Sequence, residues 1–322
     1  MRALITGAAG FIGHNVVRFL EQQNIECFGV DNRTDYGFIP KDELEYLIKE
    51  RFNRIRSIPL VGDIRNTNDT VSRVGIFGVD TIIHLASFPR QKVVSQNPVL
   101  ASEVMSTGLI NLLEAARIHK VKKFVYISSS MVYGDFENNV SEDAPCNPIG
   151  QYGIMKYMGE QLVRDYARQY GFEYVIIRPS AVYGEYDVED RVVSKFMLSA
   201  MRGETLKVKG ANEVLDFTYV EDAAKGIVQA TLSPNTANKI YNITRSDTKL
   251  TTLLEAAQMA VKIAGQGSIE VQDRDLAFPK RGRLNIDRAV ADFGYAPTVN
   301  VEEGFQRYYN WFKNSTYWQK QL

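Results

Sequence analysis

The stretch Ala3-Leu4-Ile5-Thr6-Gly7-Ala8-Ala9-Gly10-Phe11-Ile12-Gly13 lies near the start of a chain of 322 residues and decides its fold. The first four residues read as a short buried strand, and the glycines open an amphipathic helix with Val16, Val17 and Leu20 on its apolar side. Glycines let the backbone approach a phosphate closely, and a helix N-terminus presents free N–H groups to it. The stretch therefore predicts a βα unit that binds a dinucleotide.

An acidic residue follows where such a unit needs one. A second strand, residues 26–30, ends at Asp31, which lies 18 residues after Gly13. A carboxylate there accepts hydrogen bonds from both ribose hydroxyls and repels a 2′-phosphate, which favours NAD over NADP. Arg33 is the opposing signal, because its cation could attract a 2′-phosphate.

The rest of the first half alternates strand and helix patterns. Strands are expected near residues 2–6, 25–30, 57–61, 80–85, 123–128 and 173–178. This alternation predicts an α/β fold, a Rossmann doubly wound parallel sheet. Residues 41–55 have apolar side chains at helical spacing and charges on the other side, so they read as a surface helix packed on the fold with its charges in solvent, or alternatively as a partner-binding helix.

After the sixth strand the pattern becomes irregular, and a helix is expected near residues 192–201. We expect a smaller α/β substrate-binding lobe to begin here. The expected division gives residues 1–178 and about 216–246 to the Rossmann domain, and about 179–215 and 247–322 to the lobe. A cleft between the two is a preferred place for a small-molecule site.

Composition limits the possible partners. The 38 basic and 38 acidic residues cancel, so no long-range field is expected to gather nucleic acid or an anionic membrane. No run reaches about 18 apolar residues, so no membrane span is expected. Cys27 and Cys146 form no disulfide framework, and His14 and His119 suggest no metal site. A soluble enzyme in a reducing cytoplasm is the interpretation.

A tyrosine and a lysine lie four residues apart in Gln151-Tyr152-Gly153-Ile154-Met155-Lys156. On a helix this spacing puts both side chains on one face. A phenol ionises near pH 10, so Tyr152 can act as a base near neutrality only if a nearby cation favours the phenolate. Lys156 is placed to be that cation.

Together these motifs resemble the extended short-chain dehydrogenase/reductase family, and more narrowly its nucleotide-sugar epimerase and dehydratase branch. The resemblance covers nearly the whole chain. The segments that carry it are Gly7 to Gly13, Asp31, Gly62-Asp63-Ile64, His84-Leu85-Ala86, Ser128 to Gly134, Tyr152 to Lys156, Asp216 to Val220 and Phe293 to Pro297.

The resemblance implies an NAD-dependent enzyme and a role for each matched residue. Ser129 would hold a sugar oxygen, Tyr152 would be the general base and acid, and Lys156 would bind the nicotinamide ribose and stabilise the phenolate. His84, at a strand end, is expected to be structural. The implied cofactor contacts are Gly7, Gly10, Phe11, Ile12, Gly13, Asp31, Asn32, Asp63, Ile64, Leu85, Ala86, Tyr152 and Lys156.

The implied reaction removes a hydroxyl proton and a hydride from C4 of a nucleotide sugar, and epimerisation follows when the hydride returns to the other face. Dehydratases of the family carry an Asp-Glu pair after the active-site Ser or Thr, where this chain has Ser130 and Met131. Dehydration is therefore disfavoured unless Asp187 or Glu189 supplies the acid, and a 4,6-dehydratase or another keto-sugar-forming member of the family is the alternative. A non-catalytic NAD-binding scaffold is a minor alternative, since fold alone does not establish activity.

Two departures leave the nucleotide and sugar open. Ala181 stands where many relatives have Asn, and Leu215 where many have an Arg that contacts the diphosphate. Phosphate oxygens need charge-assisted donors, so another cation must replace it. The candidate substrate contacts are Arg90, Ser130, Ala181, Arg191, Lys195 and Arg281. Relatives commonly dimerise through helices that correspond to residues near 98–118 and 151–170, which implies a homodimer.

Overall fold

Seven parallel strands form the central sheet of the computed structural model, which describes residues 1–276 and 278–322. Along the sheet the order is β11 (Lys239–Ile243), β6 (Glu173–Pro179), β5 (Lys123–Ile127), β4 (Thr81–His84), β1 (Arg2–Thr6), β2 (Glu26–Asp31) and β3 (Leu60–Val61). The central strands are buried on both faces, which explains their continuous apolar runs. The strand order reverses between β1 and β4, and ligands bind at such a switch point. The predicted Rossmann sheet is confirmed.

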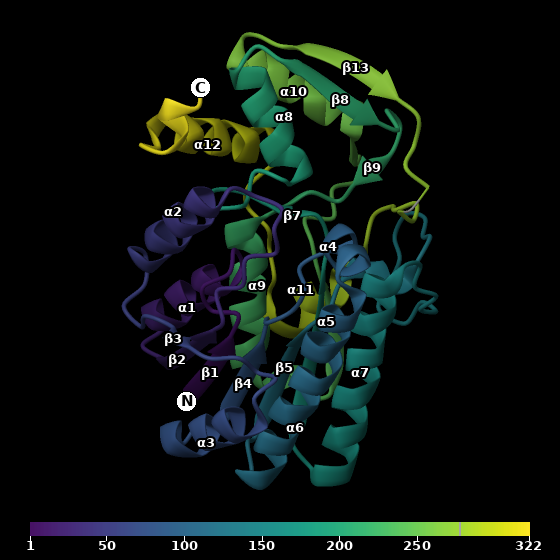
Figure 1. Ribbon diagram of the computed structural model, residues 1–322. Coiled ribbons are helices and arrows are strands. Elements are labelled where there is room, and N and C mark those ends of the chain that lie inside the picture. Colours follow the sequence, from purple (N-terminus) through teal and green to yellow (C-terminus); the bar gives the residue numbers. More distant parts are fainter. Residues whose placement is uncertain (277) are drawn as a thin grey trace.

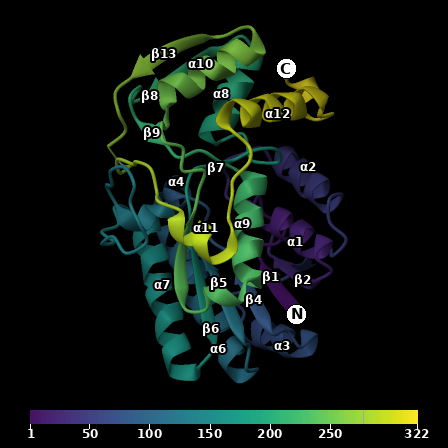
Figure 2. The same ribbon diagram turned by 180° about the vertical axis from the view of Figure 1, so that it is seen from behind.

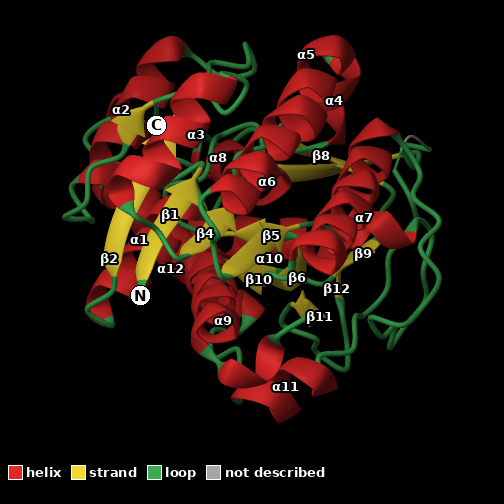
Figure 3. Cartoon of the chain, turned by 90° about the horizontal axis from the view of Figure 1, so that it is seen from below, coloured by secondary structure: helices red, strands yellow, loops and turns green. Residues whose placement is uncertain are grey.

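Two layers of helices cover the sheet, as the view from below shows (Figure 3). One layer holds α3 (Thr67–Phe77), α6 (Gly108–Ile118) and α7 (Gln151–Tyr170), and the other holds α1 (Gly13–Gln22), α9 (Val220–Leu232) and α11 (Asp287–Phe293). Each layer packs its own apolar core against the sheet. Leu109, Leu112 and Leu113 of α6 are fully buried in the first of these cores.

Residues 98–118 form one long helical run in the first of these layers, with α6 between α3 and α7. It consists of α5 (Pro98–Ser102), a π-helical turn (Glu103–Thr107) and α6, and it follows the short helix α4 (Gln91–Gln96). By length and composition alone, the run is long and apolar enough to cross a membrane, whereas the sequence predicted no membrane span. Of its apolar 18-residue stretch, 56% is buried inside the fold, as in a core helix of the sheet layer.

The smaller lobe lies above the carboxyl ends of the strands (Figure 1). Its core joins α8, α10, α12 and three short strand pairs, β8 with β13, β9 with β12, and β7 with β10. Its elements are β7 (Val182–Tyr183), α8 (Val192–Met201), β8 (Thr205–Lys209), β9 (Val214–Leu215), β10 (Thr218–Tyr219), β12 (Thr251–Thr252), α10 (Leu253–Ala264), β13 (Ser268–Gln272) and α12 (Val301–Asn314). Thr252 and Glu255 form a capping box that starts α10.

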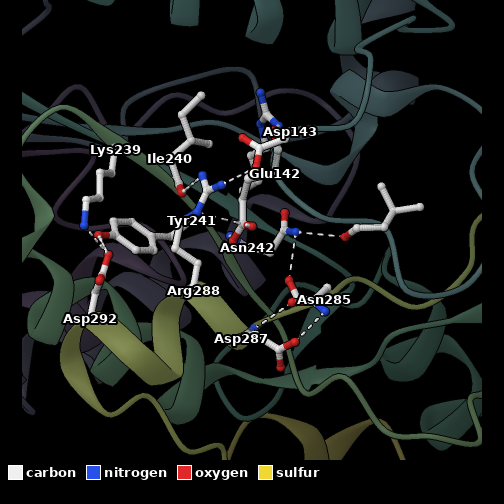
Figure 4. A network of polar contacts seen from close by, with 12 residues as sticks. Glu142, Asp143, Lys239, Ile240, Tyr241, Asn242, Asn285, Asp287, Arg288 and Asp292 are labelled. Carbon is white, nitrogen blue, oxygen red and sulfur yellow. Dashed lines mark hydrogen bonds and ion pairs between the residues drawn. The ribbon is translucent and has the colours of Figure 1, made fainter.

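A polar network fastens the edge strand β11 to its surroundings (Figure 4). The backbone N–H of Asn242 donates to Glu142, and its side-chain amide donates to the carbonyl oxygen of Asn285 at 3.0 Å. Asp292 of α11 accepts from Lys239 at 2.7 Å and from Tyr241 at 2.6 Å. Helix α11 thus packs on β11 and α9, and Figure 2 shows it beside α9. The sequence instead predicted these residues in the smaller lobe. The network covers an otherwise open sheet edge.

Helix α2 (Lys41–Phe52) lies between α1 and α12 (Figure 1). Its Tyr46 hydroxyl bonds to Ser315 at 2.7 Å, beyond the end of α12. The sequence predicted a helix here with its charges in solvent, but Glu43 is fully buried and Arg51 is 4% exposed. The prediction that charged residues of this helix face solvent is therefore wrong for these two residues, because the loop 184–191 and α12 cover them.

Candidate active site

A cavity of about 1360 Å³ extends from the switch point of the sheet into the smaller lobe. It is lined by every site residue expected from the sequence except Asp63: Gly7, Gly10, Phe11, Ile12, Gly13, Asp31, Asn32, Ile64, Leu85, Ala86, Arg90, Ser129, Ser130, Tyr152, Lys156, Ala181, Arg191, Lys195 and Arg281. The Asp63 carboxylate instead accepts a bond from Arg65 at 2.7 Å and one from the Asn32 amide at 3.4 Å. The fold thus brings both expected halves of the site together.

The glycine turn leaves no room for side chains. Gly7 has a φ of +73°, and its N–H donates to the carbonyl of Val30 at 2.9 Å. A Cβ on Gly13 would lie 2.0 Å from the Gly7 carbonyl oxygen, and one on Gly10 would lie 2.9 Å from the same atom. The backbone is therefore bare where α1 begins, as close approach of a pyrophosphate requires.

Asp31 lies beside this turn. Its two carboxylate oxygens accept from the backbone N–H groups of Ala9 at 3.0 Å and Arg33 at 2.7 Å, while burial raises its pKa. The Arg33 guanidinium donates to the carbonyl of Pro59 at 3.2 Å and stacks on Phe52, with 5.0 Å between them. Its cation is thus already engaged by protein groups. The turn and Asp31 together fit the pyrophosphate and ribose of NAD.

Ser129, Tyr152 and Lys156 meet at the ends of β5 and α7. The Ser129 hydroxyl hydrogen-bonds to the Tyr152 phenol and accepts from the Met131 backbone N–H at 3.2 Å. The Lys156 ammonium donates to the carbonyl of Ile127 at 2.8 Å and lies 5.9 Å from the centre of the Tyr152 ring. The expected trio is therefore within reach of one bound molecule.

The charges around Tyr152 differ from the expectation. Burial raises the pKa of the Tyr152 phenol, and the Ser129 hydrogen bond and the charge of Arg191 act against this. Burial also lowers the pKa of Lys156 to about 7, which the nearby Glu160 carboxylate partly offsets. The charge of Arg191, in the loop 184–191, is thus a source of stabilisation for the phenolate that the sequence did not predict.

A buried ion pair lies beside the trio of Ser129, Tyr152 and Lys156. Arg178 of β6 donates to both oxygens of Glu160, at 2.9 and 2.7 Å, and Glu160 follows Lys156 by one helical turn. The Ser128 hydroxyl donates to the same carboxylate at 2.6 Å. These hydrogen bonds satisfy charges that would otherwise be expensive to bury. They fix α7 against the end of β5.

His84 is a packed core residue. Its Nδ1 bonds to the Thr6 hydroxyl at 2.7 Å, and its ring lies 5.8 Å from the ring of Tyr126. Burial, followed by the charge of Lys156, lowers its pKa to about 3, so the imidazole is neutral. This agrees with a structural role.

The candidate substrate cations divide into two groups. Arg90 and Lys195 both pair with Asp190, at 2.6 and 2.5 Å, beside the loop 184–191. Arg191 lies 3.5 Å from Asp187. Arg281 lies at the lobe end of the cavity, where burial lowers its pKa to about 10 despite the charge of Glu213. A cation that is costly to bury and lines a cavity is suited to an anionic ligand.

Three residues that line the cavity were not predicted from the sequence to belong to the site. Arg51 lies within the buried face of α2, Gln91 accepts a bond from the Tyr152 backbone N–H at 2.9 Å, and Arg274 reaches the lobe end of the cavity beside Arg281. Arg51 is one of several charges on an amphipathic helix, and the other two lie in segments without a motif. Only tertiary packing distinguishes them from surface residues.

Known proteins are similar to this chain along most of its length. The model of the NAD dependent epimerase/dehydratase family matches residues 3–244. A putative UDP-glucose 4-epimerase from Methanocaldococcus jannaschii is 32% identical over 97% of this chain and 98% of that protein.

Solved structures of epimerases are also similar to this chain along most of its length. The UDP-glucuronic acid 4-epimerase from Bacillus cereus, in complex with UDP-glucuronic acid and NAD, is 27% identical, with a TM-score of 0.88 over 97% of this chain and 99% of that one. The UDP-glucose 4-epimerase from Thermus thermophilus, in complex with NAD, is 26% identical, with a TM-score of 0.85 over 98% of this chain and all of that one. The chain belongs to the NAD dependent epimerase/dehydratase family, and NAD is its cofactor.

Proposed function

We propose that the protein is an NAD-dependent 4-epimerase of a nucleotide-diphosphate sugar. The observation that carries this proposal is the placing of Ser129 and Tyr152 in one cavity with the glycine turn and Asp31. The named relatives support the same reaction, since they are 4-epimerases of UDP-glucose and UDP-glucuronic acid.

Each catalytic residue has a separate task. Ser129 holds the C4 oxygen of the sugar next to the phenol, and Tyr152 takes the hydroxyl proton and later returns it. Lys156 binds the nicotinamide ribose, and Arg191 favours the phenolate by its charge. NAD supplies the hydride acceptor and donor when bound. Return of the hydride to the opposite face of C4, with the proton returned to the C4 oxygen, inverts C4.

The glycine turn and its neighbours hold the cofactor in this proposal. Asp31 accepts the adenosine ribose hydroxyls beside the turn, and Asn32, Ile64, Leu85 and Ala86 complete the contacts along the cavity wall. Asp63 acts at the adenine end through Arg65 and Asn32, since its own side chain bonds to both.

A 4,6-dehydratase is the second candidate, and one residue favours it. Asp187 lines the cavity, its pKa is raised by burial, and one of its oxygens has no hydrogen-bond partner within the described residues. Such a carboxyl group is able to donate a proton. The position directly after Ser130, however, is Met131, which cannot transfer one. Epimerisation needs no acid there.

The substrate's diphosphate is assigned to the lobe end of the cavity. Arg281 and Arg274 lie there, with Lys207 and Lys209 of β8 also on the wall, and together they compensate for Leu215. Arg90, Lys195 and Ser130 remain contacts at the sugar end, and the small side chain of Ala181 leaves space beside them. The relatives make a UDP-sugar the first compound to test.

The assembly and setting are proposed with the reaction. A homodimer through α6 and α7 would cover exposed apolar residues on these and adjoining segments, among them Val99, Ile118, Ile154 and Tyr170. Both cysteines are free, which suits a reducing cytoplasm. Residues 1–178 and about 216–246 form the NAD-binding domain in this proposal, and α11 joins them by packing on β11.

One experiment tests the reaction and names the substrate. The purified protein with NAD⁺ is incubated separately with UDP-, GDP-, CDP- and dTDP-linked hexoses, hexuronates and N-acetylhexosamines, and products are followed by NMR and mass. An equal-mass C4 epimer from one of them supports the proposal. A product lighter by one water supports the dehydratase, and no conversion of any compound refutes both.

A further inference from the structure

The buried guanidinium of Arg51 joins two parts of the cavity that are far apart in sequence. It donates to the carbonyl of Ala9 in the glycine turn at 3.1 Å, and to the carbonyl of Tyr186 at 2.7 and 3.2 Å. The first carbonyl belongs to the cofactor end. The second belongs to the substrate loop, by which we mean residues 185–191, whose Asp187, Asp190 and Arg191 line the cavity.

The charges that stabilise Arg51 also come from both ends. Burial works against its positive charge, and the carboxylates of Asp187 and Asp31 act in its favour. Asp31 borders the glycine turn and Asp187 belongs to the substrate loop. Because a buried arginine needs its partners, a shift of either end weakens the contacts that remain at the other.

Tyr186 is held in a conformation that needs such support. Its φ is +70°, which is unfavourable for a residue with a side chain. Its ring lies 4.4 Å from the Arg54 guanidinium and 5.2 Å from the ring of Trp311 in α12. Strain that is held at one residue by several elements is released when one of them moves.

A second route joins the same two ends. Arg54 donates to Nε2 of His14 at 2.9 Å, so the neutral imidazole donates from Nδ1 to the Gly10 carbonyl, also at 2.9 Å. Since Arg54 stacks on Tyr186, this route also runs from the glycine turn to the substrate loop. Glu43 of α2 also contacts the substrate loop, because its carboxyl group accepts from the Glu189 backbone N–H at 2.8 Å.

We propose that Arg51 is a positioning residue that couples the glycine turn to the substrate loop, so that bound NAD orders the loop that receives the nucleotide sugar. This inference rests on the proposed function for the identity of the second ligand. Coupling between two sites is reciprocal, so the sugar also favours NAD binding.

The test measures amide hydrogen exchange by mass spectrometry with NAD⁺ as the only ligand. In the wild-type protein, we expect NAD⁺ to slow exchange of residues 185–191 by about fivefold or more. In Arg51→Lys, which retains the charge and loses the two-pronged geometry, NAD⁺ should still slow exchange of residues 7–13 but lose most of its effect on the loop. Arg288→Lys is the matched control, because Arg288 bonds to Asp143 and to the carbonyl of Ile240, contacts neither carbonyl that Arg51 binds, and does not line the cavity.

Three results would overturn the coupling. They are a wild-type loop whose exchange does not change with NAD⁺, a folded Arg51→Lys protein whose loop responds as in wild type, and an Arg288→Lys protein that loses the response equally. If the lysine variant does not fold, Arg51→Gln replaces it. The effect of NAD⁺ on the wild-type loop is measured without either variant. Turnover of a sugar is not measured, so failure of the proposed reaction would leave this result intact.

A kinetic measurement separates positioning from chemistry. With the sugar found by the substrate panel, Arg51→Lys should raise KM for the sugar and the dissociation constant of NAD⁺ together, while kcat at saturation falls by less than about threefold. A large fall in kcat at unchanged KM would place Arg51 in the chemical step and contradict the positioning role.

Discussion

Tyr152 is the residue on which the proposed chemistry depends. Its burial raises the cost of ionisation, and Ser129 and Arg191 lower that cost. In the proposed mechanism the phenol therefore functions as a base only inside the assembled cavity, where the hydrogen bond and the cation are both in place. This explains why the residue pair Tyr152 and Lys156 is recognisable in the sequence although its electrostatics are not.

Tyr152→Phe removes the transferable proton and little else. We expect turnover to fall by at least about 10²-fold, because general acid–base groups contribute that much or more, while NAD remains bound. Activity and NAD content of the purified variant are the measurements. Tyr157→Phe, on the same helix but away from the cavity wall, is the control that should keep its activity. A Tyr152→Phe enzyme within tenfold of wild type would remove Tyr152 from the proton transfer.

Asp31→Ala tests the cofactor choice at a single residue. Loss of the carboxylate removes the acceptor for the ribose hydroxyls and the repulsion of a 2′-phosphate. We expect NAD⁺ to bind at least about tenfold more weakly, and its advantage over NADP⁺ to shrink. Titration of the apo-protein with each cofactor gives both constants. An unchanged ratio of the two would refute the ribose contact.

At the scale of elements, the glycine turn and α2 show what sequence can and cannot predict. The strand, the glycines and Asp31 lie within one βα unit, so their geometry follows from local sequence. Arg51 and Glu43 look like ordinary charges on an amphipathic helix, and their burial depends on α12 and the loop 184–191. The clustering of Arg90 and Lys195 on Asp190 was equally out of reach, because it joins segments about 100 residues apart.

Gly13→Ala tests the close packing of the glycine turn against α1. The new Cβ would lie 2.0 Å from the Gly7 carbonyl oxygen, so the turn must shift. We expect a loss of about 1–3 kcal/mol in stability and weaker NAD binding, measured by denaturant unfolding and cofactor titration. Gly75→Ala in α3 meets only the exposed His119 ring and serves as control. Wild-type NAD affinity in Gly13→Ala would contradict the assigned role of the turn.

Glu43→Gln tests the burial of a carboxyl group on α2. Burial raises the pKa of Glu43 to about 8 from an ordinary value of 4.5. Between these pH values the unfolded chain releases the proton and the folded chain keeps it, so Glu43 lowers the stability of the wild type as the pH rises from 4.5 to 8.

Glutamine cannot ionise, so the Tm of Glu43→Gln minus the Tm of the wild type should increase by about 2 °C or more from pH 5 to pH 8.5. Thermal unfolding at the two pH values is the measurement. Glu45→Gln on the exposed side of the same helix is the control and should show no comparable gain. A Tm difference between Glu43→Gln and wild type that does not change with pH would show that Glu43 is not buried as a neutral acid.

At the scale of the whole molecule, the cavity joins a cofactor half and a substrate half that the chain builds from alternating segments. The sheet supplies the glycine turn, Asp31 and the catalytic trio, while the lobe supplies Arg281 and Arg274. The presence of a second lobe was predictable from the change of pattern after β6. Its binding residues were only partly predictable, because Leu215 and Ala181 depart from the family pattern and their replacements lie in segments without a motif.

The central claim is that C4 is inverted by removing and returning one hydride inside this cavity. The most direct measurement uses the nucleotide sugar identified by the panel, labelled with deuterium at C4 and converted in ordinary water. The account predicts an epimer that retains the deuterium at C4. An epimer in which a solvent hydrogen has replaced the label would contradict hydride transfer and, with it, the proposed mechanism.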